Sequence, residues 1–229
     1  LVFQEPMTSF SPIHTIGNQM AEAIMLHNDV SKKAAKDRSL ELLNMVGIPN
    51  PDQRLNELSY QLSGGLRQRA MIAMAISCNP KLLIADEPTT ALDVTTQAQI
   101  LELLRGLQEQ NQMAIMLITH NLGVIAEMTD EVVVMYLGKA VETGPIDDIF
   151  HNPKHPYTQA LLRSIPSIQS SGREKLPSIS GSIPHPFNRP YGCTFYPRCP
   201  SFMDGVCNKH VPEFLPLEGT EQHVRCFLH

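Results

Sequence analysis

The sequence predicts an α/β protein with a largely parallel sheet, followed by a small Pro- and Cys-rich extension. Short apolar segments alternate with segments of helical periodicity, which is the pattern of strands joined by helices. The apolar segments are almost continuously hydrophobic, as expected for strands that are covered on both faces. From about residue 151 proline becomes frequent and the periodicity fades. We therefore predict one domain over residues 1–150 and a separate extension over residues 151–229.

The helices are predicted from apolar residues that recur about every 3.6 positions. Residues 18–47 are helix-forming and stop at Gly47, where a polar, Pro-containing connector begins. A second helix is expected to follow "LSGG" and to run over residues 66–77. Residues 95–111 form an amphipathic pattern, and residues 121–129 predict a short helix.

The strands are predicted from short apolar runs. "KLLIAD" at 81–86 and "MAIMLITH" at 113–120 have the length and composition of buried strands. Residues 131–144 predict two strands around the turn at 137–139, and this hairpin is expected to lie antiparallel at the edge of the sheet.

Composition limits the class of protein. Of the 229 residues, 42% are hydrophobic and 18% are charged, so a sizeable core can form. A net charge of −5 and the absence of Trp argue against a nucleic-acid partner. No apolar run approaches the roughly 18 residues that cross a bilayer. The start, "LVFQEPMTSF", lacks the features of a signal peptide, and its strand-like "LVF" leads us to expect that upstream sequence is missing.

The pair Asp86-Glu87 is the strongest local signal. A strand that ends in two carboxylates places them at the carboxyl edge of the sheet, where ligands bind in open α/β folds. Asp86 would hold Mg²⁺ through water, and Glu87 would orient the water that attacks a γ-phosphate. The alternative is a helix N-cap with an acidic first turn.

Two further positions point to a phosphate site. Ser63, Gly64 and Gly65 stand at the entrance of a helix, where backbone N–H groups and the helix dipole attract anions. The alternative is an ordinary Ser-capped helix. His120 ends a predicted strand and would act as a hydrogen-bonding sensor at the same sheet edge, although a single His there is also compatible with a structural role. Gln4 follows an apolar strand end and alone indicates little.

The order of these motifs carries more information than any one of them. Gln4, "LSGGLRQR" at 62–69, "LLIADEPTTALD" at 82–93 and His120 follow one another along the chain. This order resembles the nucleotide-binding subunit of ATP-binding cassette (ABC) transporters, over roughly residues 1–150. The resemblance implies a P-loop NTPase-type (RecA-like), mostly parallel sheet with an inserted helical subdomain at about 10–75.

The resemblance also implies roles for individual residues. Gln4 matches the Q-loop glutamine, Asp93 the D-loop, and Glu87 with His120 the catalytic pair. ATP and Mg²⁺ are the implied cofactors, with Asp86 and Gln4 as Mg²⁺ ligands. The implied nucleotide-binding set is Gln4, Ser63, Gly64, Gly65, Gln68, Asp86 and Asp93. In this family the signature loop at Ser63 to Gly65 serves the ATP of the opposing subunit, so a second ATPase subunit is required.

One motif of the family does not occur in the sequence. The phosphate loop G-x-x-x-x-G-K-[ST], whose Lys and backbone contact the β- and γ-phosphates, is absent from these 229 residues. On the family pattern it is expected about 50–60 residues before Gln4. We therefore expect that this chain alone neither binds ATP tightly nor hydrolyses it.

The segment after residue 144 narrows the resemblance. "NPKHPYTQALL" at 152–162 and "CTFYPRCP" at 193–200 are similar to the C-terminal extension of the peptide/nickel branch of ABC importers. This implies an ATPase subunit that energises import of oligopeptides or dipeptides. It further implies a paralogous or identical second ATPase subunit, two transmembrane permease subunits and an extracytoplasmic substrate-binding protein. The protein is expected to lie peripherally on the cytoplasmic face of the membrane.

Three other functions stay open on the sequence. A nickel importer would share the same extension. A soluble ABC ATPase of DNA repair or translation would lack the "HPYTQALL" tail and would often carry basic patches. A non-catalytic interaction fragment is kept open by the missing phosphate loop.

The cysteines raise a separate question. Cys78 lies at an apolar helix end and is expected to be an inert core residue. The other four, Cys193, Cys199, Cys207 and Cys226, are spaced C-x₅-C-x₇-C-x₁₈-C. A disulfide framework, a zinc site, an iron–sulfur site and four unrelated thiols are all compatible with this count.

Context orders these alternatives. A cytosolic ATPase makes disulfides unfavourable, and zinc sites usually contain C-x₂₋₄-C knuckles, which do not occur here. Four cysteines on a Pro-rich segment suit a [4Fe–4S] cluster, which some members of the resembled branch carry in this extension. We predict such a cluster with a structural role. If Zn²⁺ is bound instead, the spare candidate ligands are His210, His223 and His229.

Overall fold

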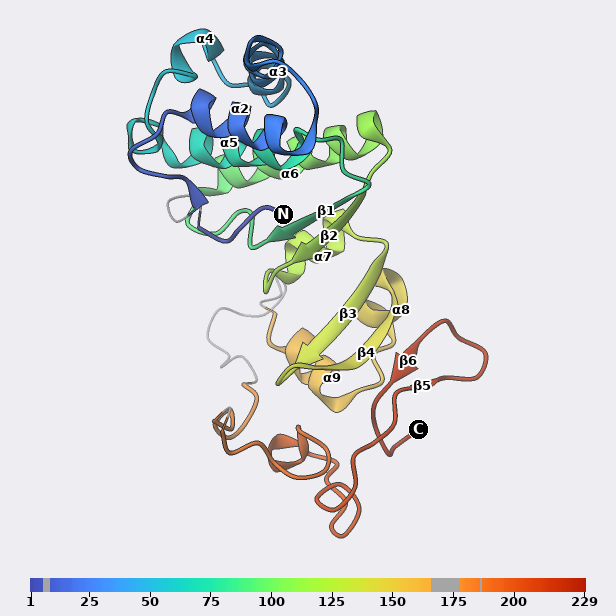
Figure 1. The fold of residues 1–229 in the computed structure, drawn as a ribbon. Helices are drawn as coiled ribbons and strands as arrows, with labels where there is room; N and C mark the ends of the chain where they lie inside the picture. The colour runs from blue at the N-terminus through green and yellow to red at the C-terminus, as the bar shows by residue number, and fades with distance from the viewer. Residues whose placement is uncertain (6–8, 166–177, 186) are drawn as a thin grey trace. The chain divides into compact units, whose positions relative to one another are not determined.

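The fold is that of a computed structural model, which describes residues 1–5, 9–165, 178–185 and 187–229 (Figure 1). The described residues form two compact units, Leu1–Asn121 and Leu122–His229, and each is considered by itself. Within the described residues, no helix combines the length and the apolar character that crossing a bilayer requires.

The helices of the first unit begin at polar capping residues. α2 (Ile16–His27), α3 (Lys32–Met45), α5 (Gly64–Ile76) and α6 (Val94–Asn111) are capped by Thr15, Ser31, Ser63 and Asp93. Each cap side chain accepts a hydrogen bond from a backbone N–H in the first turn, which would otherwise lack a partner. The short helix α4 (Pro51–Arg54) has proline at its first position. The predicted helices at 66–77 and 95–111 are confirmed, and the 18–47 segment is divided into α2 and α3.

The core of this unit lies between its helices and strands. α2, α3 and α5 pack on one another, and α5 also packs on α6. In Figure 1, α5 and α6 lie closer to the strands than α3 and α4 do. The largest fully buried side chains here are Ile16, Met20, Leu42, Leu43, Met71, Ile72, Leu83, Ile100, Leu104 and Leu107. α2 to α5 span residues close to the predicted 10–75 segment, and its assignment as a helical subdomain stays a prediction.

Two parallel strands carry the ends of the sequence motifs. β1 (Leu82–Asp86) pairs with β2 (Ala114–Ile118) in the register Leu82↔Ala114 to Asp86↔Ile118. On the other side of β1, Val2 forms a parallel bridge with Ala85, with Val2 N–H bound to Ile84 O at 2.8 Å. The prediction of a parallel arrangement for these strands is confirmed.

Two burial predictions are wrong. β2 is not a fully buried strand, because Met116 and Ile118 are 51% and 48% exposed while β1 buries Leu83 and Ala85 completely. The reason is that successive side chains of a strand point to opposite faces, and the described residues cover only one face of β2. Cys78 is exposed rather than part of the core, because it lies beyond the last residue of α5, Ile76.

The second unit is built on an antiparallel hairpin. β3 (Glu131–Tyr136) pairs with β4 (Lys139–Pro145), which confirms the predicted antiparallel hairpin. Its expected place at the edge of the parallel sheet is wrong, because the hairpin belongs to a separate sheet and pairs with a strand of the extension instead. Its two-residue turn, Leu137-Gly138, has positive φ at both positions, and such turns match the twist of the strands they join. α7 (Leu122–Met128) precedes the hairpin and α8 (Ile146–His151) follows it.

The extension adds two strands that the sequence did not predict. β5 (Leu215–Pro216) and β6 (His223–Val224) extend the hairpin to a sheet in the order β3-β4-β6-β5. Strands of two residues are too short to show an alternating pattern, so sequence periodicity could not identify them. The buried cluster on this sheet contains Val132, Val134, Tyr136, Val141, Ile149 and Phe195. α9 (Pro156–Arg163) and the 3₁₀ turn η2 (Tyr196–Arg198) complete the unit.

The hairpin therefore packs with the extension. The compact units divide after Asn121, whereas the sequence placed the domain boundary after residue 150. The difference arises because β4 pairs with β6 and because Phe195 belongs to the cluster on β3 and β4. Compact packing units and family domains are different divisions of a chain, so the 1–150 and 151–229 domains stay a prediction.

Candidate functional site

Four predicted site residues follow parallel strand positions and therefore lie at one sheet edge. Asp86 ends β1, Glu87 comes next, and His120 lies two residues after the end of β2. Gln4 lies two residues beyond Val2, which runs parallel to β1. Parallel strands bring their carboxyl ends to the same edge, which is where open α/β sheets bind ligands. Asp86 is half-buried, whereas Gln4 is exposed.

The backbone of Glu87 has an unusual conformation at this edge of the sheet. Glu87 has φ +48, in the left-handed region, and its N–H donates to Ile118 O at 2.8 Å. A residue other than glycine is strained in the left-handed region, and it occurs there mostly where the surrounding structure enforces it. Here the bond to β2 holds the backbone, and the side chain turns toward His120.

Both carboxylate oxygens of Glu87 accept hydrogen bonds. Oε1 lies 2.5 Å from Nδ1 of His120, and Oε2 accepts from the hydroxyl of Thr90 at 2.7 Å. Burial acts to raise the pKa of Glu87. The hydrogen bonds from His120 and Thr90 lower this pKa by more than burial raises it, so it lies below its usual value. Glu87 is therefore held as an acceptor-only carboxylate. The His120 side chain is 82% exposed, which leaves its other nitrogen open to a ligand.

Thr90 was not predicted as a site residue. It lies three residues after Glu87, where a side chain can reach back to the end of the strand. The run "EPTTALD" contains two threonines, so the sequence signal existed without identifying which of them would bind.

The second group of predicted residues lies at the starts of α5 and α6. Ser63 caps α5 through Leu66 N–H at 3.4 Å, and Asp93 caps α6 through Thr96 N–H at 2.9 Å. A Cβ at Gly65 would approach Thr96 Cγ2 to 2.8 Å, so the two helix starts come close together only because residue 65 is glycine. Hydrogen bonds from Thr96 lower the pKa of Asp93.

Two members of this group differ in their exposure. Ser63 and Gly64 are exposed and open to a phosphate group. Gln68 is only 2% exposed and its amide nitrogen has no hydrogen-bond partner within the described residues. Contact between Gln68 and a nucleotide stays a prediction, and it requires this side chain to move.

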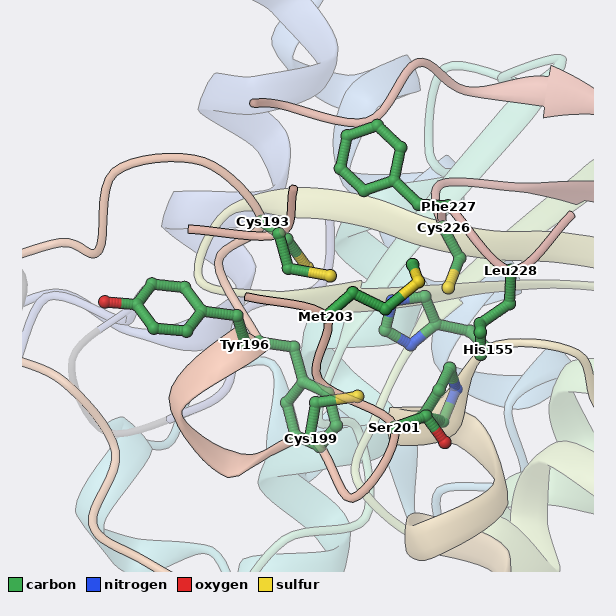
Figure 2. A pocket seen from close by; sticks show the side chains of 12 residues that line it. His155, Cys193, Tyr196, Cys199, Ser201, Met203, Cys226, Phe227 and Leu228 are labelled. Atoms are coloured by element: carbon green, nitrogen blue, oxygen red, sulfur yellow. The ribbon is translucent and has the colours of Figure 1, made fainter. Parts of the chain in front are cut away.

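The four clustered cysteines line a single pocket in the second unit, together with His155 and Met203. Figure 2 shows the sulfurs of Cys193, Cys199 and Cys226 directed toward the same space as the ring of His155. The complete lining is His155, Pro156, Cys193, Phe195, Tyr196, Cys199, Ser201, Met203, Cys207, Cys226, Phe227 and Leu228. All five cysteines of the chain are free thiols.

The pocket is apolar, and this affects the thiols. Burial raises the pKa of Cys193, Cys199 and Cys226, that of Cys226 to about 11, with the neighbouring thiols adding to the effect. Without a positive charge in the pocket these thiols stay protonated. A bound metal supplies that charge and favours the thiolate form.

The thiols are not arranged around the position of one ion. Across the described part of the chain, no three His, Cys, Asp or Glu side chains form a group that could hold a metal ion. Of the spare ligands considered for zinc, none lines the pocket: His210 and His229 are exposed, and His223 stacks on Phe214 at 5.8 Å.

His155 is a pocket residue that was not among the predicted site residues. It is 1% exposed and lines the cysteine pocket. Its position beside Pro156 predicts a helix start, which α9 confirms. Its proximity to cysteines that lie 38 or more residues later depends on the packing of η2 and could not be read from the chain.

Two family models match different parts of the chain. The family model described as ABC transporter matches residues 1–90, and the model described as the C-terminal region of oligopeptide/dipeptide transporters matches residues 141–207. Among solved structures, the dimeric ATP-binding cassette MJ0796 bound to ADP and Pi is 28% identical with a TM-score of 0.55, covering 63% of this chain and 61% of that one. The protein cbiO1 from Clostridium perfringens is 25% identical with a TM-score of 0.57, covering 66% and 58%.

Curated relatives extend the similarity to the whole chain. The oligopeptide transport ATP-binding protein AppD of Bacillus subtilis is 52% identical over 229 residues, which is 100% of this chain and 69% of that protein. The dipeptide transport ATP-binding protein DppD of Haemophilus influenzae is 56% identical over 213 residues, 93% and 64%. DppD of Escherichia coli is 54% identical over 204 residues, 89% and 62%. The chain thus spans about two thirds of the length of these relatives, and it belongs to the family of ABC transporter ATP-binding proteins that carry the oligopeptide/dipeptide transporter C-terminal region.

Proposed function

We propose that the protein is the ATP-binding and hydrolysing subunit that energises import of oligopeptides or dipeptides across the cytoplasmic membrane. The observation that carries the proposal is the hydrogen-bonded pair Glu87 and His120 at the strand ends beside Asp86. The relatives named for oligopeptide and dipeptide transport support the substrate class.

The residues at the sheet edge fit the oxygen chemistry that Mg²⁺ requires. Asp86 supplies a carboxylate and Gln4 an amide oxygen, and Mg²⁺ prefers oxygen ligands and retains several waters. When bound, Mg²⁺ neutralises charge on the phosphates of ATP. Glu87, kept ionised by His120 and Thr90, accepts a hydrogen bond from a water and orients it. His120 is exposed beside Glu87 and directs its second nitrogen to the terminal phosphate region. Because Nδ1 donates to Glu87, this nitrogen donates to a phosphate oxygen when the ring is protonated.

The second group of residues is assigned to a different nucleotide. Ser63, Gly64 and Gly65 form the start of α5, where backbone N–H groups and the helix dipole favour a phosphate. We assign this surface, with Asp93 beside it, to the ATP held by a second ATPase subunit. Two permease subunits and an extracytoplasmic substrate-binding protein complete the proposed assembly, and the protein binds peripherally at the cytoplasmic face.

The proposal is tested with Glu87→Gln in the protein expressed from its complete gene. Glutamine keeps the size of the side chain but removes its charge, so ATP hydrolysis is expected to fall by about 10²–10⁴-fold while ATP binding is retained. Glu102→Gln, an exposed glutamate on α6, is the control and should hydrolyse ATP normally. Hydrolysis at the wild-type rate by Glu87→Gln would contradict the assignment. The 229-residue chain alone should not hydrolyse ATP, because it contains no G-x-x-x-x-G-K-[ST] loop.

The alternative functions are distinguished by the extension and the charge. The match of residues 141–207 to an oligopeptide/dipeptide transporter region weighs against a non-transport ATPase of DNA repair or translation, as does the net charge of −5. Nickel import is distinguished by transport assays with labelled dipeptide and with nickel. Uptake of nickel alone would overturn the peptide assignment.

We also propose that Cys193, Cys199, Cys207 and Cys226 hold a [4Fe–4S] cluster. Support comes from four free thiols that line one apolar pocket. Zinc binds four ligands directly at about 2.3 Å, which requires the sulfurs to meet around one point. A cluster binds each thiolate at a separate iron and so accepts more widely spaced sulfurs. Its role is structural, because the extension has few buried apolar side chains of its own.

Metal analysis of anaerobically purified protein tests this site. We expect iron and acid-labile sulfide in equal amounts and broad absorbance near about 400 nm. Zinc without iron would support the alternative site. Neither metal in the purified protein would contradict both.

A further inference from the structure

Thr90 is bound to Glu87 at two places. Its backbone N–H donates to Glu87 O at 3.1 Å, and its hydroxyl donates to Glu87 Oε2 at 2.7 Å. The backbone bond closes a turn that begins at Glu87, and this turn brings the hydroxyl back to the carboxylate. A hydroxyl bound to a carboxylate at this distance makes a charge-assisted hydrogen bond, which is about twice as strong as one between neutral groups.

The turn itself determines where Thr90 lies. Glu87 at its start has φ +48, and Ala91, which follows Thr90, has φ +62. Such backbone conformations persist where the surrounding structure determines them, and here the N–H of Glu87 is bound to Ile118 O at 2.8 Å. Of the two threonines in the turn, Thr89 is buried and Thr90 is exposed. The threonine that reaches Glu87 is therefore the one at the surface of the sheet edge.

A single hydrogen bond does not fix the orientation of a carboxylate. The last torsion of a glutamate side chain is broad and roughly two-fold, so a carboxylate held through one oxygen still turns about its final C–C bond. His120 holds Oε1 of Glu87 at 2.5 Å, and Thr90 holds Oε2. Two donors on separate oxygens fix the plane of the group and leave each oxygen a further lone pair. A carboxylate in a fixed plane accepts a hydrogen bond from water in a defined direction, as in-line attack on a phosphate requires.

We infer that Thr90 is a positioning residue for hydrolysis, whose hydroxyl holds the carboxylate of Glu87 in the plane in which it orients the attacking water. The inference rests on the proposed role of Glu87 in ATP hydrolysis and adds a residue that acts through Glu87. Loss of the hydroxyl should therefore slow the chemical step and leave ATP binding unchanged. A displacement of about 1 Å at a reacting group can lower a rate by about 10²-fold.

Four substitutions in the protein expressed from its complete gene test this role. Thr90→Val keeps the size and branching of the side chain but removes the donor, and Thr90→Ala removes the donor without adding an apolar group to the turn. Thr90→Ser keeps the hydroxyl and removes only a methyl group. Thr95→Val, at an exposed threonine on α6, is the matched control.

The measurements are kcat and KM for ATP hydrolysis and, separately, the Kd for ATP, with Glu87→Gln measured in parallel. We expect Thr90→Val and Thr90→Ala to lower kcat by about 10–100-fold with KM and Kd unchanged. Thr90→Ser and Thr95→Val should stay near the wild type.

Three results would overturn the inference and leave the role of Glu87 intact. These are hydrolysis at the wild-type rate without the hydroxyl, a rate for Thr90→Ser as low as that for Thr90→Val, and a Kd raised as much as kcat is lowered. The last result would make Thr90 a binding residue. If Glu87→Gln hydrolysed ATP normally, the proposed role of Glu87 would fail and the inference with it.

Discussion

Glu87 and His120 are joined by a hydrogen bond of 2.5 Å between Oε1 and Nδ1. A carboxylate can only accept, so the imidazole donates. The bond links the residue after β1 to the segment after β2, two strands that are separated by 27 residues in the sequence and adjacent in the sheet. Because β1 and β2 are paired, this bond holds Glu87, the residue proposed to orient the water, in a fixed position.

The pKa of Glu87 should depend on this bond. Burial acts to raise that pKa, and His120 and Thr90 outweigh it, so removal of a donor by His120→Ala or Thr90→Val should raise the titration midpoint of the carboxyl. Carbon-13 NMR of the glutamate carboxyls measures the midpoint directly. His27→Ala, at an exposed helix end, is the control and should leave it unchanged. An unaltered midpoint in both test variants would contradict the stated cause.

The same shift predicts the sign of a pH effect on stability. The folded-state pKa of Glu87 lies below its ordinary value of 4.5, so the ionised form favours folding. This contribution is present above about pH 4.5 and is lost as the pH falls through the folded-state pKa. The difference in free energy of unfolding between wild type and Glu87→Gln should therefore shrink on acidification. A difference that grows toward low pH would have the wrong sign.

Gly65 should be intolerant of a methyl group for a steric reason. Gly65→Ala would place Cβ 2.8 Å from Cγ2 of Thr96, whose hydroxyl is bound to Asp93 at 2.7 Å. We expect a loss of about 1–3 kcal/mol in the free energy of unfolding, measured by urea denaturation. Adding Thr96→Ser should restore most of it, since serine lacks the methyl and keeps the hydroxyl.

A matched glycine on α6 provides the control for that experiment. A Cβ at Gly106 would meet no atom within 4 Å, so Gly106→Ala should stabilise the helix by roughly 0.5–1 kcal/mol. If Gly65→Ala behaved like Gly106→Ala, the close approach of the two helix starts would be wrong.

Glu142 should be required for the fold of the second unit. Its buried carboxylate accepts hydrogen bonds from the backbone N–H groups of Lys154 and His155. Glu142→Gln retains one acceptor but turns an NH₂ group toward a backbone N–H, which leaves a buried donor unsatisfied. The expected cost is about 1–3 kcal/mol in the free energy of unfolding. The exposed Glu131→Gln on β3 should cost little. Equal stability of the two variants in thermal or urea denaturation would argue against the buried clamp.

The four clustered cysteines should act as one set. Serine at Cys193, Cys199, Cys207 or Cys226 should lower the iron content of purified protein, because each thiolate holds one corner of the proposed cluster. Cys78→Ser should not, because Cys78 is exposed and lies in the first unit. Iron retained in all four variants would contradict the assignment of these cysteines as ligands of the cluster.

The local features of the chain were accessible from the sequence. Ser63 and Asp93 mark the starts of α5 and α6, and the apolar runs before Asp86 and His120 form β1 and β2. Such features depend on neighbouring residues, through capping and periodicity, and are therefore encoded locally. The order of the motifs along the chain indicated the family, because that order is read directly from the sequence.

The long-range features were decided only by the tertiary structure. The sequence could not show that β4 pairs with the two-residue strand β6, or that Met116 and Ile118 stay half exposed. Nor could it bring His155 to the pocket of Cys226, seventy-one positions away in the chain. Contacts across such separations depend on packing around Tyr136 and Phe195 rather than on any local pattern. The reason is that the free energy of burial depends on complementary shape and apolar area, and not on distance along the chain.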